Sequence, residues 1–190
     1  MRFTKMQGIG NDYIYLVCLN QLPQNPSALA KRLSDRHYGI GSDGLVLICP
    51  SEHADFCMQM YNADGTQAEM CGNAIRCVGK LVYDRGLTQK TTLQIETLAG
   101  IKTLWLTVSN QVVSMVTVDM GLPILQPHEI PVLVDGEQAV RIPIPIEERE
   151  YTATCVSMGN PHAVLFLDAE TDLAQLNLGE LGPLFEHHPL

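Results

Sequence analysis

Long apolar runs are missing from this 190-residue sequence, and so are clusters of Lys and Arg. No run approaches the roughly 20 apolar residues that a membrane-spanning helix needs, and the amino terminus from Met1 to Met6 holds no hydrophobic core of a signal peptide. The 12 basic residues are scattered among 21 acidic ones, for a formal charge of -9, which makes nucleic acid and anionic membranes poor partners. We therefore expect a soluble cytoplasmic protein without a nucleic-acid or membrane partner.

Cysteines with the spacing of a metal site are also missing. The six cysteines form no Cys-x-x-Cys pair, and no His pair stands near them at ligand spacing, so we expect no metal. In a reducing cytosol the thiols should stay free. Four of them lie within β-like apolar runs and are interpreted as small buried hydrophobes: Cys18, Cys49, Cys57 and Cys155.

The patterning of the first 120 residues predicts an α/β domain. Short apolar or alternating runs predict strands at residues 13–19, 45–49 and 56–61. A first helix has Asn25 as N-cap, Pro26 at its first position and Gly39 as its stop. A second helix is predicted over residues 72–84, with Gly86 after it. A three-stranded meander follows at residues 92–97, 101–108 and 112–120, with turns at Ala99-Gly100 and Asn110-Gln111.

From Gly121 the sequence becomes rich in proline, which suits a connection between domains or edge strands. We therefore expect two domains, residues 1–120 and 121–190. In the second, strands are predicted at residues 151–158 and 163–167 and a short helix at 172–178. No closing helix or hairpin is apparent after these elements, so the second domain is expected to be incomplete.

Cys71 is the most informative residue, because it stands at the predicted start of the second helix. Unpaired backbone N–H groups and the helix dipole favour a thiolate there and can also hold a carboxylate. Gly72 lets a ligand approach the backbone, and the amides of Asn73 and Asn62 could bind both ends of a zwitterion. The alternative is a small capping residue in a tight turn. Cys77 lies roughly 240° further around the helix and should face the core.

Three turn segments carry further candidate groups. Residues 8–12 precede a strand rather than a helix, which excludes a dinucleotide fingerprint and leaves a β-turn with Asn in a left-handed position. In the turn at residues 39–44, Asp43 could cap the turn or orient a ligand-binding backbone. Near residue 160 a strand ends in a turn that presents Asn160 and His162, although a lone His is often structural.

Taken together, these segments resemble the diaminopimelate epimerase family of lysine biosynthesis. Five of them occur in the family's order across nearly the whole chain, at residues 5–12, 39–44, 62–65, 70–77 and 158–163. The resemblance implies two similar domains of antiparallel strands wrapped around a central helix, with the substrate in a cleft between them. Gln7 stands where many members of the family have His. Gly44 stands where some members have a substrate-contacting Gln.

The resemblance also implies a reaction without pyridoxal phosphate or another cofactor. One cysteine thiolate removes the α-proton of LL-diaminopimelate, and a second cysteine donates a proton from the other face to give the meso isomer. Cys71 matches the first cysteine, and His162 matches a histidine that tunes the pair. The second cysteine should lie beyond Leu190, so the chain alone is expected to be inactive or nearly so. The family resemblance suggests a homodimer. Substrate-binding positions are matched by Asn11, Asn62, Gly72, Asn73 and Asn160.

Other functions remain open on the sequence alone. A cysteine hydrolase could use Cys71, His162 and Asn160 as nucleophile, base and orienting group. A related amino-acid racemase independent of pyridoxal phosphate or a non-catalytic binding module would also fit these residues. Solvent deuterium in the substrate would indicate an epimerase, whereas an acyl-enzyme would indicate a hydrolase.

Overall fold

The structure is a computed structural model that describes residues 1–190. The chain divides into two compact units, Met1–Met120 and Gly121–Leu190. None of its helices has both the length and the apolar character that crossing a membrane would take. Each unit has its own sheet and its own core.

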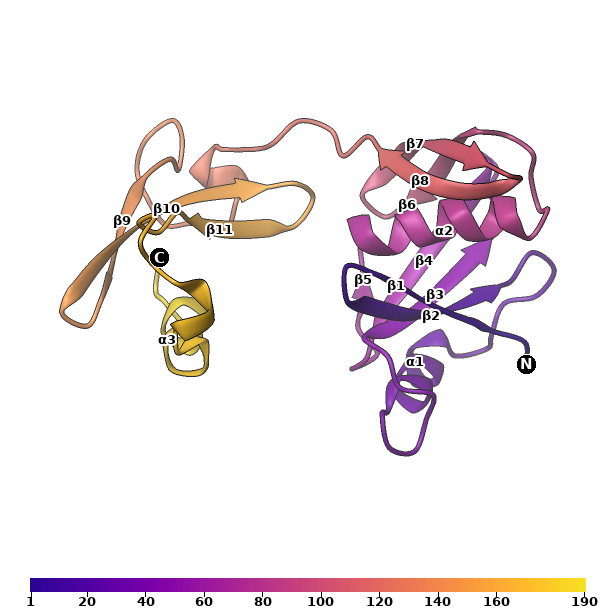
Figure 1. The fold of residues 1–190 in the computed structure, drawn as a ribbon, viewed down its shortest axis with the longest axis horizontal. Coiled ribbons are helices and arrows are strands. Elements are labelled where there is room, and N and C mark those ends of the chain that lie inside the picture. The colour runs from indigo at the N-terminus through magenta and orange to yellow at the C-terminus, as the bar shows by residue number, and fades with distance from the viewer. The chain divides into compact units, whose positions relative to one another are not determined.

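The first unit is a curled sheet with one helix on each face (Figure 1). The main strand order is β1-β2-β3-β4-β6-β7-β8, and β5 pairs with β4. Helix α2 lies in the curve of the sheet, and α1 packs on the other face. The strands are β1 Thr4–Gly8, β2 Asn11–Val17, β3 Gly44–Cys49, β4 Phe56–Asn62, β5 Gln67–Ala68, β6 Thr92–Thr97, β7 Gly100–Ser109 and β8 Val112–Val118, and the helices are α1 Pro26–Ser34 and α2 Gly72–Asp84.

Burial explains the sequence pattern of β3. All six of its residues are buried, because alternate side chains enter the cores on the two faces of the sheet. The sequence of a strand covered on both faces is one continuous apolar run and does not alternate between apolar and polar residues. Ile75 and Val78 of α2, both with no exposed surface, occupy the centre of the larger core.

The predicted α/β fold with strands around a helix is confirmed, but the sheet is mixed rather than wholly antiparallel. β2 pairs with β3 in parallel, and so does β4 with β6. In both cases a helix lies between the two strands in the sequence and carries the chain back, so that the second strand runs in the same direction as the first. Parallel pairing requires such a crossover.

The first helix is shorter than predicted, whereas the second has the predicted bounds. α1 ends at Ser34, because the carboxylate of Asp35 accepts hydrogen bonds from the N–H groups of His37 and Tyr38, both at 2.7 Å, and turns the chain. α2 runs over Gly72–Asp84, and Gly86 follows it with φ +70°. A left-handed Gly after a helix is the expected C-terminal signal.

The meander after α2 is confirmed, with one turn shifted. Asn110 and Gln111 form the β7–β8 turn with φ of 52° and 64°, as a tight hairpin of two left-handed residues requires. Thr97 pairs with Gly100, so the β6–β7 turn consists of residues 98 and 99, one position earlier than predicted.

The second unit is a three-stranded antiparallel sheet in the order β11-β10-β9. β9 is an edge strand in which Pro143 and Pro145 are exposed while the isoleucines between and beside them are buried. Proline is tolerated there because an edge strand has one side without ladder hydrogen bonds. The elements are β9 Ile142–Ile146, β10 Arg149–Ser157, β11 Pro161–Leu165, the short 3-10 helices η1 Pro127–Glu129 and η2 Leu173–Gln175, and α3 Leu178–Glu186.

The helix predicted at residues 172–178 is wrong. That segment holds the single 3-10 turn η2, and the α-helix α3 begins at its end. α3 contains Gly179, Gly182 and Pro183, which have the poorest helix propensities and hide the helical pattern. Pro183 lies in the helix interior.

Candidate active site

Cys71 is the N-cap of α2 and has an extended backbone with φ -141°. Its Sγ accepts a hydrogen bond from the N–H of Ala74 at 3.5 Å and another from Nδ2 of Asn11 at 3.5 Å. The side chain is half-buried at the edge of the larger core. An N–H of the first helical turn and a side-chain amide therefore converge on this sulfur, and donors of this kind favour its anion.

Asn11 reaches Cys71 through a tight hairpin between β1 and β2. Gly8 pairs with Asn11, so Ile9 and Gly10 form the turn with φ of 55° and 83°. The sequence had suggested Asn in the left-handed position, and this is wrong: the two turn residues take that conformation and leave Asn11 extended at the start of β2. Oε1 of Gln7 accepts the N–H of Gly10 at 2.8 Å and holds the turn.

Tyr13 lies beside this site, and no signal in the sequence marks it. It is 5% exposed and belongs to the larger core, against which Cys71 packs. Burial raises the pKa of Tyr13 to about 12, with smaller contributions from the negative charges of Cys71 and Asp43. In the sequence, Tyr13 cannot be told from the apolar residues that follow it in the same strand.

Gly44 is the first residue of β3 and Asn62 the last of β4, so both lie at the same end of the strands as Asn11, the first residue of β2. Tyr13 pairs with Gly44, and Gly44 pairs with Asn62. A side chain at Gly44 would collide with the carbonyl of Tyr61, and its Cβ would lie 2.7 Å from Cε1 of Tyr13. Nδ2 of Asn62 donates to Oγ1 of Thr66 at 3.0 Å, which leaves the amide oxygen as the group of Asn62 that can accept from a ligand.

The first turn of α2 presents Gly72 and Asn73. Both are half-buried, and their N–H groups are among those that a helix leaves without internal acceptors. Nη2 of Arg76 donates to Oδ1 of Asn73 at 2.6 Å, and its Nη1 donates to the Gly72 carbonyl at 3.2 Å. Arg76 therefore fixes the Asn73 amide with its NH2 group available as a donor. The one signal of this role in the sequence is the i, i+3 spacing of Arg76 from Asn73.

In the second unit, Asn160 and His162 lie together at one end of the β10–β11 hairpin. Nε2 of His162 and Oδ1 of Asn160 are 3.1 Å apart, and both side chains are exposed. Gly159 takes φ +101° in the turn, a conformation that glycine tolerates best. The pair is therefore presented where the short β10–β11 turn, which holds Asn160, meets β11, which holds His162.

The other five cysteines pack in or beside the cores. Cys77 is 6% exposed, as its helical position predicted, and Cys18, Cys49 and Cys155 are buried as predicted. Burial raises the pKa of Cys49 to about 12. The interpretation is wrong only in degree for Cys57, which is half-buried. All six thiols are free, and no cluster of three His, Cys, Asp or Glu side chains could hold a metal ion.

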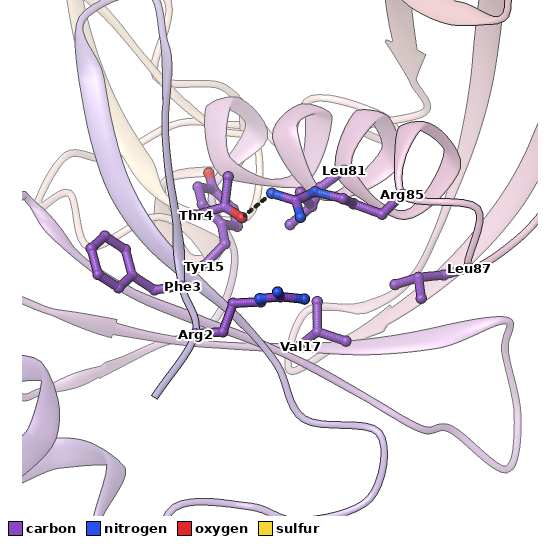
Figure 2. A pocket seen from close by; sticks show the side chains of 8 residues that line it. All are labelled: Arg2, Phe3, Thr4, Tyr15, Val17, Leu81, Arg85 and Leu87. Carbon is purple, nitrogen blue, oxygen red and sulfur yellow. Dashed lines mark hydrogen bonds between the residues drawn. The ribbon is translucent and has the colours of Figure 1, made fainter.

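A separate hollow of about 280 Å³ lies at the other end of α2 (Figure 2). It is lined by Leu81 of α2, by Arg85 and Leu87 just after the helix, and by residues of the amino-terminal segment, β1 and β2. Nη2 of Arg85 donates to Oγ1 of Thr4 at 3.1 Å across it. Because a 13-residue helix is about 20 Å long, this hollow is remote from Cys71 and forms no part of the candidate site.

Comparisons with known proteins identify the family of the chain. The family model described as diaminopimelate epimerase matches residues 3–125. The diaminopimelate epimerase of Acetivibrio thermocellus is 58% identical over 190 residues, which are 100% of this chain and 67% of that protein. That of Methanococcus maripaludis is 55% identical over 188 residues, 99% of this chain and 67% of that protein. The chain thus spans about two thirds of the length of these relatives.

Solved structures with low sequence identity support the fold. A hydroxyproline epimerase from Agrobacterium vitis with bound trans-4-OH-L-proline has a TM-score of 0.61 at 16% identity, covering 86% of this chain and 50% of that one. A probable proline racemase from Agrobacterium radiobacter K84 also has a TM-score of 0.61, at 14% identity, covering 95% of this chain and 52% of that one. The chain spans about half the length of these structural neighbours, which show the architecture alone. From the family model and the relatives above half identity, the chain belongs to the diaminopimelate epimerase family.

Proposed function

We propose that the protein interconverts LL- and meso-diaminopimelate in lysine biosynthesis, without pyridoxal phosphate, another cofactor or a metal. The observation that carries this proposal is the position of Cys71 at the start of α2, where Asn11 and the N–H of Ala74 both donate to its sulfur. Identity of 58% to a diaminopimelate epimerase supports the substrate.

In the proposed reaction, the Cys71 thiolate removes the proton from the carbon next to a substrate carboxylate. An amino-acid α-proton is weakly acidic, so the reaction needs donors that stabilise the negative charge developing on that carboxylate. The N–H groups of Gly72 and Asn73 are suited to this task, because they stand beside the base at the positive end of α2.

The remaining site residues are assigned by their chemistry. Asn11, Asn62 and Asn160 bind the polar groups of the substrate, and Asn73 does so through its free NH2 group. His162, oriented by Asn160 at 3.1 Å, tunes the protonation of the thiol. Inversion also needs an acid on the opposite face of the substrate carbon, which we propose to be a second thiol.

A solvent-isotope experiment tests the function. The full gene product is incubated with LL-diaminopimelate in deuterated water, and the deuterium at the α-carbon and the fraction of meso product are followed by NMR. We expect deuterated meso product, and we expect Cys71→Ala to lower its rate by at least about 1000-fold, as loss of the reacting group does in other enzymes. The matched control is Cys57→Ser, a half-buried cysteine outside the site, which should retain activity.

Other outcomes point to the competing functions. Accumulation of an acyl-enzyme on Cys71 with an activated ester, and no deuterium in diaminopimelate, would indicate a cysteine hydrolase. Inversion of proline but not of diaminopimelate would indicate a different racemase. Binding that is unchanged in Cys71→Ala, without hydrogen exchange in the parent, would indicate a binding module.

We also propose that the full protein is a homodimer in the cytoplasm. The six free thiols suit a reducing compartment. Sedimentation equilibrium of the full gene product tests the dimer, and a monomer mass across the micromolar range would contradict it.

A further inference from the structure

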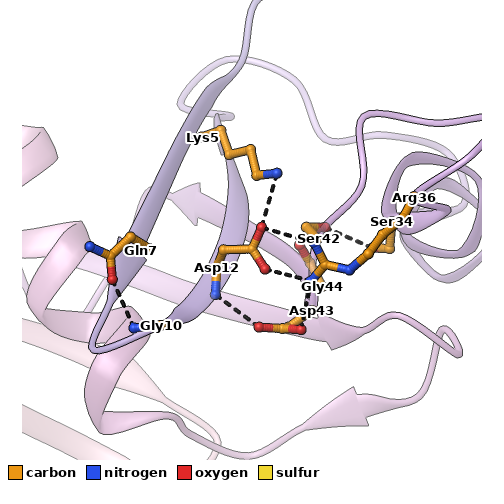
Figure 3. Close-up of polar contacts among 9 residues, drawn as sticks. All are labelled: Lys5, Gln7, Gly10, Asp12, Ser34, Arg36, Ser42, Asp43 and Gly44. Carbon is orange, nitrogen blue, oxygen red and sulfur yellow. Dashed lines mark hydrogen bonds and ion pairs between the residues drawn. The ribbon is translucent and has the colours of Figure 1, made fainter.

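Four charged side chains form a network next to the candidate site (Figure 3). Nη2 of Arg36 lies 2.7 Å from Oδ1 of Asp12 and 3.0 Å from Oδ1 of Asp43. Nζ of Lys5 lies 2.9 Å from Oδ2 of Asp12. The members come from β1, the start of β2, the turn after α1 and the residue before β3. Two cations thus neutralise two neighbouring carboxylates that would otherwise repel each other.

The network also binds the backbone beside two site residues. Oδ2 of Asp43 accepts the N–H of Asp12 at 2.9 Å, and the N–H of Asp43 donates to the carbonyl of Asp12 at 2.7 Å. The carbonyl of Asp43 accepts the N–H of Ala63 at 3.0 Å. Asp12 directly follows Asn11, and Ala63 directly follows Asn62. Asp43 therefore links the peptide groups that follow both asparagines.

Arg36 is itself held in place. Asp35 turns the chain after α1 through its hydrogen bonds to His37 and Tyr38. Further on, the buried Ser42 bonds back to Ser34, with 3.1 Å between the two hydroxyl oxygens. The guanidinium is thus presented from an anchored loop, and its planar group can engage two carboxylates in a fixed geometry.

Fold stability alone does not account for the pair of Arg36 with Asp43. The side chains of Arg36 and Asp43 are 55% and 43% exposed, and exposed ion pairs add little to the free energy of unfolding. The hydrogen bond from Arg36 holds the pKa of Asp12 well below its usual range, with Lys5 adding to the effect against burial. Asp12 therefore stays ionised and keeps the network intact at neutral pH.

We propose that Arg36 and Asp43 are positioning residues that hold Asn11 and Asn62 in register with Cys71. Their effect on the sulfur passes through Asn11, whose Nδ2 lies 3.5 Å from it. Neither residue touches the substrate. This inference deepens the proposed function, but it concerns a property of the thiol that can be measured without turnover.

The test measures alkylation of Cys71 by iodoacetamide in the full gene product, read by mass spectrometry of the peptide that contains it. The alkylation rate at pH 7 divided by the rate at pH 10 reports how readily the thiol ionises. Differences in the access of iodoacetamide to the sulfur cancel in this ratio. Losing one donor to a charged group should lower this ratio by about fivefold to tenfold. We expect Arg36→Gln and Asn11→Ala each to lower the ratio by this amount. Arg36→Lys should lower the ratio less than Arg36→Gln does.

A double variant separates positioning from independent effects. If Arg36 acts through Asn11, Arg36→Gln combined with Asn11→Ala lowers the ratio no further than Asn11→Ala alone. The matched control is Lys90→Gln. Lys90 pairs with Asp55 at 2.5 Å, and Asp55 also accepts a backbone N–H, from Gln94, but at the other end of β4. This variant should leave the ratio unchanged.

The proposal is overturned if Arg36→Gln leaves the ratio at the parent value, or if the effects of Arg36→Gln and Asn11→Ala multiply. If Arg36→Gln does not fold, Asp43→Asn is measured in the same way and judged by the same two outcomes. Coupling found in a protein that fails to epimerise diaminopimelate would support the positioning role while rejecting the proposed function.

Discussion

The two units of the chain hold their functional residues in different ways. In the first unit, Cys71 caps a helix whose inner face is buried by the curled sheet, and Asn11 and Asn62 stand at strand ends of that sheet. In the second unit, Asn160 is exposed on the β10–β11 turn and His162 is exposed at the start of β11, and α3 has no buried residue. The proposed base Cys71 and its asparagine neighbours are therefore placed by tertiary packing, whereas Asn160 and His162 are placed by one hairpin.

Core size should separate the units most strongly, and truncating one isoleucine in each would show it. Ile75 has no exposed surface and lies at the centre of the larger core, whereas Ile144 is 5% exposed in a small one. We expect Ile75→Ala to lower the free energy of unfolding of the first unit by about 2–5 kcal/mol, and Ile144→Ala to cost less because a smaller cluster can relax around the cavity.

Urea unfolding followed by fluorescence reports the first unit, since Trp105 of β7 is the single tryptophan of the chain. Hydrogen exchange of β10 amides reports the second unit. The comparison fails if Ile144→Ala shifts the Trp105 transition as far as Ile75→Ala does.

Acid should act on the first unit through Asp12. Because the hydrogen bond from Arg36 lowers the pKa of Asp12 in the folded state, its contribution to stability is complete above the unfolded value of about 3.9 and is lost as pH falls below it. We expect Asp12→Asn to destabilise the first unit by about 1–2 kcal/mol at pH 6, on the scale of a hydrogen bond to a charged group.

The same difference between parent and variant should shrink progressively below about pH 4, because Asp12 takes up a proton there in the unfolded chain while it stays ionised in the folded one. Urea midpoints from pH 6 to pH 3 measure it. A difference independent of pH would show that Asp12 acts by packing rather than by charge. Glu150→Gln, an exposed position in β10, is the control in the second unit and should change neither midpoint nor pH dependence.

The smallest effect concerns two hairpin turns, one from each unit, that each hold a residue in a left-handed conformation. Ile9 has φ 55° in the β1–β2 turn, and Glu147 has φ 53° in the β9–β10 turn. A left-handed conformation costs these residues about 1–2 kcal/mol, and glycine recovers part of it. We expect Ile9→Gly and Glu147→Gly each to stabilise its own unit by about 0.5–1 kcal/mol, measured by urea unfolding.

Only the first of these turns stands beside the candidate site. Ile9→Gly should also change the alkylation rate of Cys71, because Asn11 follows this turn directly and reaches the sulfur. Glu147→Gly should not. Equal effects of the two variants on Cys71 would contradict a local role of the β1–β2 turn.

Much of the fold could be predicted because its signals are local. The bounds of α2 follow from apolar spacing and a Gly beyond its end, and the β7–β8 turn follows from two residues that tolerate left-handed conformations. Prediction failed where a distant or atypical feature decides the structure. The end of α1 depends on a side-chain turn at Asp35, and α3 forms despite Pro183.

By itself, the sequence determined that a thiol stands at a helix start with asparagines and glycines around it, because capping and periodicity act over a few residues. Only the tertiary structure brought Asn11 to within 3.5 Å of a sulfur 60 positions away and tied Asp12 to Asp43 through Arg36. These contacts depend on strand order and register, which are set by how the whole sheet packs around α2. No short stretch of residues contains that information.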